Sequence, residues 1–480
     1  MTNSSGSPLR GWLSPVVYLS NNWISLLGVI VVTSATILWL FWLPTTWRGE
    51  AENPYTGIVL YLLLPGVFFS GLILIPLGIL WERRRERASG LLPANFPPLT
   101  FRNPEVRRLA AFVGVTTFAN IVIASQLTYS AVNYMESVSF CGQTCHTVMK
   151  PEFTAYQNSA HSRVECVKCH IGAGAGWFVR SKLSGTRQLL AVAFKTYDRP
   201  IPTPVRNLRP ARETCESCHW PQVFGGNRLK VISKFADDEQ NTATKTVLFL
   251  HIGGGSGTEG IHGAHVGKGI RIRYAASDEK RQTIPWVEYT DAKGKVTAYT
   301  ASDAKSAMPG NLPIREMDCM DCHNRPSHTY EMPESAVDRA MASGAIAASL
   351  PFAKKTGVEI LKAAYKTEDE AASRIPAAFE AFYREKYPDT YASNRKDVEI
   401  SARGVLGVFS RNIFPEMNVT WGAYPNNVGH TEFPGCFRCH DDQHVSPDGA
   451  KVTQDCGSCH NLLAMEEAAP KILTDLGLEK

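Results

Sequence analysis

Three long segments of the 480-residue chain lack charged side chains altogether: residues 11–47, 53–81 and 109–135 contain no Asp, Glu, Lys or Arg. A helix needs about 20 apolar residues to cross a bilayer, and each segment holds such a run. The most apolar parts are 23–43, 56–81 and 109–131. No small-residue cleavage site follows the first run, which argues against a cleaved signal peptide. The sequence therefore predicts three transmembrane helices.

The second and third predicted spans are less regular than the first. The second contains Pro65 and Pro76, which predict a kink because proline removes a backbone donor from a helix. The third contains the polar residues Asn120 and Gln126 and is the weakest of the three spans.

Outside the predicted membrane region the chain lacks a basic excess. Residues 132–480 carry 41 Lys and Arg against 40 Asp and Glu, whereas residues 1–131 carry 9 against 5. This balance excludes an extended nucleic-acid surface. The basic side chains between the second and third spans are Arg83, Arg84, Arg85, Arg87, Arg102, Arg107 and Arg108, whereas Arg48 stands alone between the first and second. By the positive-inside rule, the N-terminus and the arginine-rich loop are cytoplasmic and residues after the third span lie in the bacterial periplasm.

The chain has no unpaired cysteine in its sequence pattern: all twelve cysteines belong to pairs, and a histidine directly follows the second cysteine of each pair. The six pairs are Cys141/Cys145-His146, Cys166/Cys169-His170, Cys215/Cys218-His219, Cys319/Cys322-His323, Cys436/Cys439-His440 and Cys456/Cys459-His460. Five have the spacing C-x-x-C-H and the first has C-x-x-x-C-H. Disulfides need no histidine at a fixed offset, zinc clusters do not normally place it next to the second cysteine, and a thioredoxin-like motif occurs once. The pattern predicts six haem c groups, each bound through two thioethers with the motif histidine on its iron.

A six-coordinate haem iron also needs a second axial ligand, which the remaining histidines can supply. The candidates are His161, His251, His262, His265, His328, His430 and His444. All seven lie in the segment that carries the motifs, and a solvated or buried histidine is the competing interpretation. His328 and His444 each follow a motif closely, a position that can block them from that haem.

The six motifs leave about 58 residues of the exported segment for each haem, too few for ordinary cores, so the haems should supply much of the apolar interior. Residues 333–392 have helical apolar patterns, with Pro376 at a helix start. Strand-like runs at 246–252, 270–274, 286–289 and 295–299, with a hairpin turn at 291–294, surround a Gly- and His-rich loop at 251–265.

The expected fold is a multihaem cytochrome c: three transmembrane α-helices, then a periplasmic domain of helices and loops around stacked haems, with a small β-rich insertion. Its expected parts are a membrane domain (1–131), a trihaem region (132–222), the β-rich insertion (223–318) and a largely helical C-terminal trihaem region (319–480).

Two stretches around the first three motifs resemble the NapC/NirT family of membrane-anchored quinol-dehydrogenase cytochromes: FCGQTCHTVMKPEFTAYQNSAHSRVECVKCH (140–170) and RPIPTPVRNLRPARETCESCH (199–219). The resemblance implies quinol oxidation at a haem close to the membrane and transfer of electrons to a periplasmic partner. It also implies that Met149 ligates the first haem, although the stretched motif alters the spacing, and that His161 is a distal ligand of another haem. Lys182 matches the family's lysine near the quinol. No Asp or Glu occurs between Cys169 and Asp198, so Lys150 and Glu152 are the alternative groups for quinol protons.

These features predict an inner-membrane, multi-pass, quinol-oxidising hexahaem cytochrome. Its expected partners are the membrane quinol pool and a periplasmic cytochrome or reductase. Two alternatives stay open at this point: an electron-transfer subunit of a larger respiratory complex or homo-oligomer, and a terminal multihaem reductase with an open iron site.

Overall fold

The structure is a computed structural model that describes residues 14–16, 18–20, 22–46, 62–93, 96, 104–144, 146–172, 174–205, 208–220, 225–254, 257, 259–302 and 310–479. The chain divides into two compact units, Met1–Phe140 and Cys141–Lys480.

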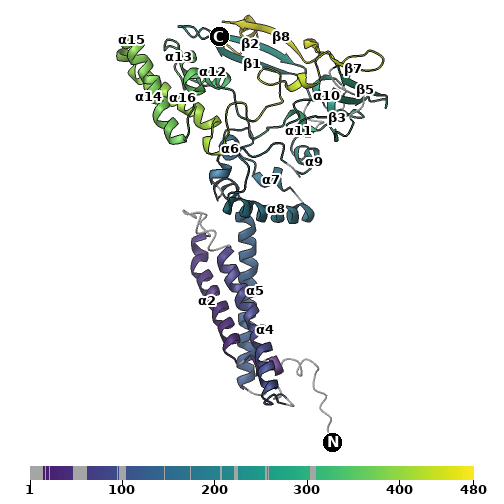
Figure 1. Cartoon of the computed structure of the whole chain (residues 1–480), viewed down its shortest axis with the longest axis vertical. Helices are drawn as coiled ribbons and strands as arrows, with labels where there is room; N and C mark the ends of the chain where they lie inside the picture. The colour runs from purple at the N-terminus through teal and green to yellow at the C-terminus, as the bar shows by residue number, and fades with distance from the viewer. Residues whose placement is uncertain are drawn as a thin grey trace. The chain divides into compact units, whose positions relative to one another are not determined.

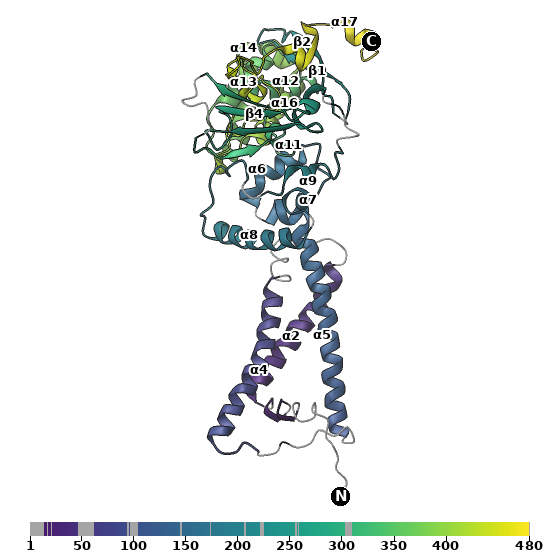
Figure 2. The ribbon, with the colours of Figure 1, turned by 90° about the vertical axis from the view of Figure 1, so that its right-hand side faces the viewer.

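The first unit is built from three long helices, one in each of the uncharged segments (Figures 1 and 2). They are α2 (Trp23–Thr46), α4 (Leu64–Ala88) and α5 (Pro104–Glu136). Their shared core contains Val32, Ala35, Trp39, Leu64, Phe68, Ile123 and Leu127. Glycines let α2 and α4 approach closely, since a Cβ on Gly28 would lie 2.8 Å from the carbonyl oxygen of Gly71. Small residues at such crossings are typical of helices that pack within a bilayer.

Among the described residues, one helix, Leu64–Ala88, is both long and apolar enough to cross a membrane, and Trp23–Thr36 is a shorter apolar helical stretch. The number of spans therefore stays a prediction. One detail of the second span was wrong: Arg83 to Arg87 continue α4 as its last turns and do not lie in a loop. Pro65 stands in the first turn of α4 and Pro76 lies inside the helix, and the kink stays a prediction.

The second unit contains short helices at the motifs and two antiparallel sheets. The first sheet has the order β1 (Arg228–Phe235), β2 (Ala243–Leu250), β8 (His460–Glu467). The second has the order β6 (Ile314–Glu316), β3 (Arg271–Ala275), β4 (Trp286–Thr290), β5 (Val296–Ala301), β7 (His444–Val445). All four predicted strands are present, and the predicted turn is closed by Asp291, whose Oδ1 accepts from the N–H groups of Lys293 and Lys295. Both sheets also take a strand from the C-terminal region, so the β-rich segment is not self-contained.

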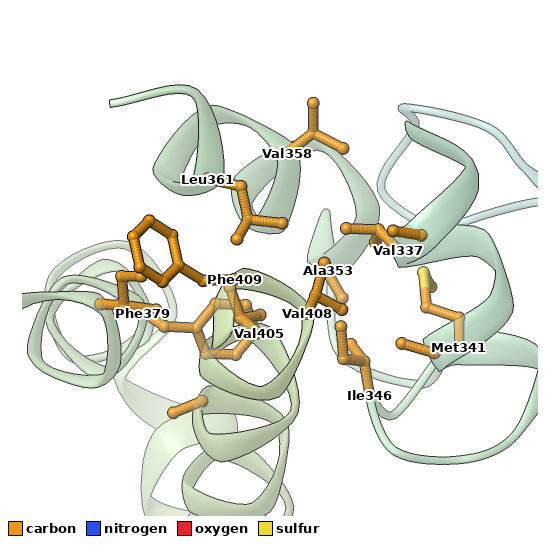
Figure 3. Close-up of a cluster of buried hydrophobic side chains, with 14 of the residues drawn as sticks. Val337, Met341, Ile346, Ala353, Val358, Leu361, Phe379, Val405, Val408 and Phe409 are labelled. Carbon is orange, nitrogen blue, oxygen red and sulfur yellow. The ribbon is translucent and has the colours of Figure 1, made fainter. Parts of the chain in front are cut away.

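A helical cluster in the second unit has an ordinary hydrophobic core. It is formed by α12 (Pro333–Ala342), α13 (Ala353–Lys362), α14 (Glu368–Lys386), α15 (Pro388–Ser393) and α16 (Arg395–Asn412). Figure 3 shows side chains such as Phe379, Val405 and Phe409 meeting at its centre, where 19 residues are buried. No cysteine occurs between Cys322 and Cys436. The expectation that haems supply the interior is therefore wrong for this cluster.

Candidate functional site

Each of the motifs after the first starts on a single helical turn, which brings its two cysteines and its histidine to one side. The turns are α7 (Cys166–His170), α9 (Ala211–Cys215), α11 (Cys319–Cys322) and the 3-10 turns Gly435–Arg438 and Cys456–Ser458. The His219 N–H donates to the Cys215 carbonyl at 2.7 Å, and the His323 N–H donates to the Cys319 carbonyl at 2.8 Å. An i to i+4 bond of this kind places the motif histidine beneath the same face that carries the thiols.

The first motif has one residue more and a different local structure. It lies in a π-helical turn, Phe140–Thr144, which accommodates one residue more than an α turn. Gly142, within this turn, packs against the ring of Phe153, since a Cβ on Gly142 would lie 2.2 Å from Cδ2 of Phe153. Cys145 and the His146 side chain lie outside the described residues. The extra residue is therefore absorbed locally, as a widened turn.

None of the described cysteines forms a disulfide; they are Cys141, Cys166, Cys169, Cys215, Cys218, Cys319, Cys322, Cys436, Cys439, Cys456 and Cys459. The thiols of successive motifs lie beside one another. A hydrogen bond with the Cys141 thiol lowers the pKa of Cys166 to about 7, and a hydrogen bond between Cys215 and Cys319 raises the pKa of Cys215.

The remaining neighbours of this kind show the same order. Burial is the main cause that raises the pKa of Cys169, Cys322 and Cys459, and a smaller rise comes from a thiol of a neighbouring motif: Cys218 for Cys169, and Cys436 for both Cys322 and Cys459. Each of these thiol pairs joins two motifs that are consecutive in the sequence. The motifs that interact through their described thiols are therefore neighbours in chain order.

Five motif histidines face a second histidine across a nearly constant gap. The ring centroids are 6.2 Å apart for His170 and His328, 5.9 Å for His219 and His161, 6.2 Å for His323 and His262, 5.8 Å for His440 and His265, and 6.3 Å for His460 and His430. Two imidazoles on one iron would be separated by about 6 Å, from two iron–nitrogen bonds of about 2 Å and about 1 Å from each nitrogen to its ring centre. The residues present therefore fit a haem iron between each pair.

Hydrogen bonds fix the orientation of several of these rings. The Nδ1 of His265 lies 2.7 Å from the Ile261 carbonyl, that of His328 3.0 Å from the Glu152 carbonyl, and that of His440 2.9 Å from the Thr453 carbonyl. A carbonyl can only accept, so Nδ1 donates and Nε2 keeps its lone pair for a metal. Burial is the main cause that lowers the pKa of His170, His262, His265, His323 and His328. The lower pKa favours the neutral ring that a metal requires.

The distal candidates His262 and His265 share one short helix, α10 (Gly260–Val266), which begins within the Gly- and His-rich loop. They are three residues apart and so lie on the same side of the helix. His262 faces the histidine of the fourth motif and His265 faces that of the fifth, so one short helix supplies ligands to two neighbouring sites.

His444 does not fit the prediction that it is a metal ligand. Its side chain is 2% exposed, with Nδ1 2.9 Å from Asp441 Oδ1 and Nε2 2.7 Å from the Ile284 carbonyl. Both ring nitrogens face protein acceptors at hydrogen-bond distance, so neither is directed at a metal. Burial opposes ionisation of Asp441, but hydrogen bonds from His444 and Gln443 lower its pKa. The His444 side chain connects β7 to the backbone at Ile284, just before β4, which is a structural role.

His251 lies beside the last motif, where its backbone N–H donates to the Cys459 carbonyl at 2.8 Å. Its described ring contact is with Phe249, with centroids 5.7 Å apart, and not with a motif histidine. Met149 is half-buried on α6 (His146–Gln157), three residues after His146.

The three polar candidates for the quinol site are dispersed. The Lys150 ammonium pairs with the Glu368 carboxylate on α14. Glu152 is half-buried and pairs instead with Arg325 at 3.3 Å and with His328 Nδ1 at 3.1 Å. Lys182 lies on α8 (Ala175–Ala193). Lys150 and Glu152 therefore serve different contacts and do not form one site.

Two buried clusters around the fourth motif were not predicted. Arg325 stacks on Tyr424 at 4.2 Å and on Tyr330 at 5.2 Å while it pairs with Glu152. Asp321, inside the motif itself, accepts from Tyr274 at 2.6 Å, from Arg315 at 2.9 Å and from Arg281 at 3.1 Å. Glu152 and Tyr424 in the first cluster, and Tyr274 and Arg281 in the second, come from distant parts of the chain. The signal in the sequence is therefore a charged residue within or next to a haem motif.

Comparison with known proteins gives two matches. Residues 104–202 match the NapC/NirT cytochrome c family, N-terminal region. The cytochrome c-type protein ImcH of Geobacter sulfurreducens is 38% identical over 450 residues, which cover 93% of this chain and 88% of that protein. No solved structure matches the chain.

Proposed function

Because this chain belongs to the NapC/NirT cytochrome c family, and so is a membrane electron-transfer cytochrome, we propose that it oxidises quinol with six haem c groups and passes the electrons to a periplasmic acceptor. The expected acceptor is a soluble cytochrome or reductase. The observation that carries this proposal is the set of five histidine pairs, each spaced for one iron.

Bound haem supplies an iron that accepts and gives up one electron at a time. The chain would hold five of these irons between two histidines each, which leaves no position for an exchangeable ligand. The sixth iron, at the first motif, would take His146 and the nearby Met149. A closed set of ligands suits electron transfer and argues against a terminal reductase, which needs an open iron to bind a small oxyanion.

The order of the motifs supports a one-way path. Contacts between Cys141 and Cys166, and between Cys215 and Cys319, join consecutive motifs. The first motif begins five residues after the end of α5 at Glu136. Electrons would therefore enter at the first haem, next to the membrane, and leave at the sixth.

A multi-pass membrane domain is part of the same proposal. Three helices share one core, and many apolar side chains on their outer surface are exposed, among them Leu26, Ile30, Phe69, Ile73, Phe118 and Ile121. Such a surface suits hydrocarbon and not water. The arginines at the end of α4 favour the cytoplasmic side for that end.

Quinol oxidation also requires groups near the first haem that orient the quinol and take its protons. We assign the quinol-orienting role to Lys182 on α8, because its position in the sequence matches the lysine that the NapC/NirT family places near the quinol.

The test is reduction of the purified, full-length protein by a quinol analogue without oxygen. Haem content is measured first by pyridine haemochrome and intact mass, with six haems expected. We expect quinol to reduce the haems, and Lys182→Gln to slow this step without changing haem content. Haems that dithionite reduces fully but quinol does not would overturn the proposal.

A further inference from the structure

Helix α8 (Ala175–Ala193) has two opposite faces of different character. On one face, Val192 packs against a buried cluster that contains Val148 and Tyr330. On the other, Leu183 is 68% exposed, Leu190 54% and Phe194, directly after the helix, 72%. These three positions are seven and four residues apart and form one stripe along the helix. Within the second unit, α8 lies at the edge, next to α7 (Figures 1 and 2).

Basic side chains border this stripe. Arg187 is exposed on α8, four residues after Leu183, and Arg180 is exposed and stacks on Trp177 at 5.1 Å. The sequence from Cys169 to Tyr197 contains four Lys and Arg and no Asp or Glu. An exposed apolar stripe is costly in water, and here basic side chains stand beside it. It is the pattern of a helix that lies in the interface of a bilayer, with arginines on lipid phosphates.

We propose that α8 lies flat on the periplasmic surface of the membrane, with Leu183, Leu190 and Phe194 inserted at the level of the headgroups and Arg180 and Arg187 bound to anionic lipid phosphates. The proposal rests on the membrane location in the proposed function. The positive charge matches anionic phospholipids, and along the chain only the first two haem motifs separate α8 from α5.

The contact would have a consequence for electron transfer. Helix α7, which carries the second haem motif, ends at His170, only five residues before α8 begins. A helix held at the lipid surface would therefore fix the height of the second haem above the bilayer and limit rocking of the haem domain on its anchor.

The experiment uses the full-length, haem-loaded protein in nanodiscs of phosphatidylcholine alone or mixed with phosphatidylglycerol. A photoreactive amino acid replaces Leu190 in one variant and Gln188 in the control. Gln188 is also exposed, but two residues correspond to about 200° of rotation, so it lies on the other side of the helix. After illumination, mass spectrometry measures lipid adducts on the protein. We expect at least fivefold more lipid adduct at position 190 than at 188.

A second arm tests the charges. Phosphatidylglycerol should increase the adduct yield at position 190 at least twofold, and Arg180→Gln with Arg187→Gln should abolish this increase. The matched control, Lys451→Gln with Lys471→Gln, removes two basic residues far along the chain and should leave the increase unchanged. Equal yields at positions 188 and 190, or adducts to a protein instead of lipid, would overturn the proposal. Reduction by quinol is measured on the same samples. Reduced haems without lipid adducts would refute only the membrane contact, and lipid adducts with unreduced haems would refute only the quinol oxidation.

Discussion

At the scale of single residues, charges that contact the proposed haem ligands matter most. Glu152 reaches His328 Nδ1 with both its backbone carbonyl and its carboxylate, at 3.0 Å and 3.1 Å. An acceptor on the outer nitrogen makes a histidine a more basic ligand, and a carboxylate does so more than a neutral group. Glu152 should therefore stabilise the ferric form of the haem held by His170 and His328.

We expect Glu152→Gln to raise the midpoint potential of that haem. Loss of an outer partner typically changes metal affinity 10- to 100-fold, which for one electron corresponds to a rise of about 60–120 mV. Spectroelectrochemical titration of the full-length protein measures the shift, with the spectrum of a bis-histidine haem otherwise retained. Glu368→Gln is the control, because Glu368 pairs with the exposed Lys150. An unchanged titration curve for Glu152→Gln would contradict the assigned role.

Asp321 is a second residue with a definite expected effect. It is 2% exposed and binds two arginines and a tyrosine, so removal of its charge takes away the carboxylate partner of Arg281 and leaves Arg315 with Asp318 alone. Breaking such a buried pair costs about 3–5 kcal/mol, and the partial exposure of both arginines places the cost at the lower end. Tyr274→Phe removes one hydrogen bond and leaves the charges paired, for about 1–2 kcal/mol.

Denaturant unfolding followed by circular dichroism compares Asp321→Asn with Tyr274→Phe in haem-loaded protein. We expect the Asp321 variant to lose clearly more free energy of unfolding than the tyrosine variant. Equal losses would mean that the ion pairs contribute nothing beyond the single hydrogen bond.

At the scale of elements, the sequence predicts the helices and strands that are determined by adjacent residues, and it misses those that form only by pairing with a distant segment. The strands β2 to β5 follow from alternating β-branched and aromatic residues, and the haem turns follow from the motifs. β8 was missed because its sequence, HNLLAMEE, favours helix, and it becomes a strand only by pairing with β2. The sequence predicts a helix start at Pro376, but α14 begins at Glu368, where Thr367 caps it by accepting from the Glu370 N–H.

The histidines show the same limit. The sequence identifies the seven candidates, but only the fold pairs His161 with His219 and engages His444 in the protein core. The pairing depends on contacts between segments that are far apart in the chain, such as His328 against His170. The residue pattern around each histidine therefore does not predict which motif histidine it will face.

The helical cluster α12 to α16 gives a prediction at this scale. Phe379 is fully buried in its core, and truncation of a buried phenylalanine typically costs about 3–5 kcal/mol. Because the cluster contains no haem motif, we expect Phe379→Ala to lower the unfolding midpoint of this cluster while the number of haems and their spectra stay unchanged. Loss of haem from this variant would show that the cluster supports the haem sites directly.

At the scale of the whole molecule, the second unit contains two kinds of interior. The helical cluster is held by apolar contacts, whereas the motif segments are joined through proposed irons. The ligand pairs cross the chain: His328 follows the fourth motif but faces the second, and His161 precedes the second motif but faces the third. Each of these two irons would therefore connect segments that are far apart in the chain, and binding of the metal group would be coupled to folding.

This coupling predicts different behaviour of the two interiors when the chain is produced without haem attachment. Hydrogen exchange should then remain slow in α14 and α16, whose core contains no haem motif, and should become fast in α7 and α10, which carry proposed ligands. In the haem-loaded protein, exchange should be slow in all four helices. Mass spectrometry of peptic fragments measures both states, and α2 and α4, in the separate first unit, are the internal reference for intact protein. If α7 and α10 stayed protected from exchange without haem, the polypeptide alone would hold the histidine pairs in place. The haem sites would then fold before haem binds, and the predicted coupling would be wrong.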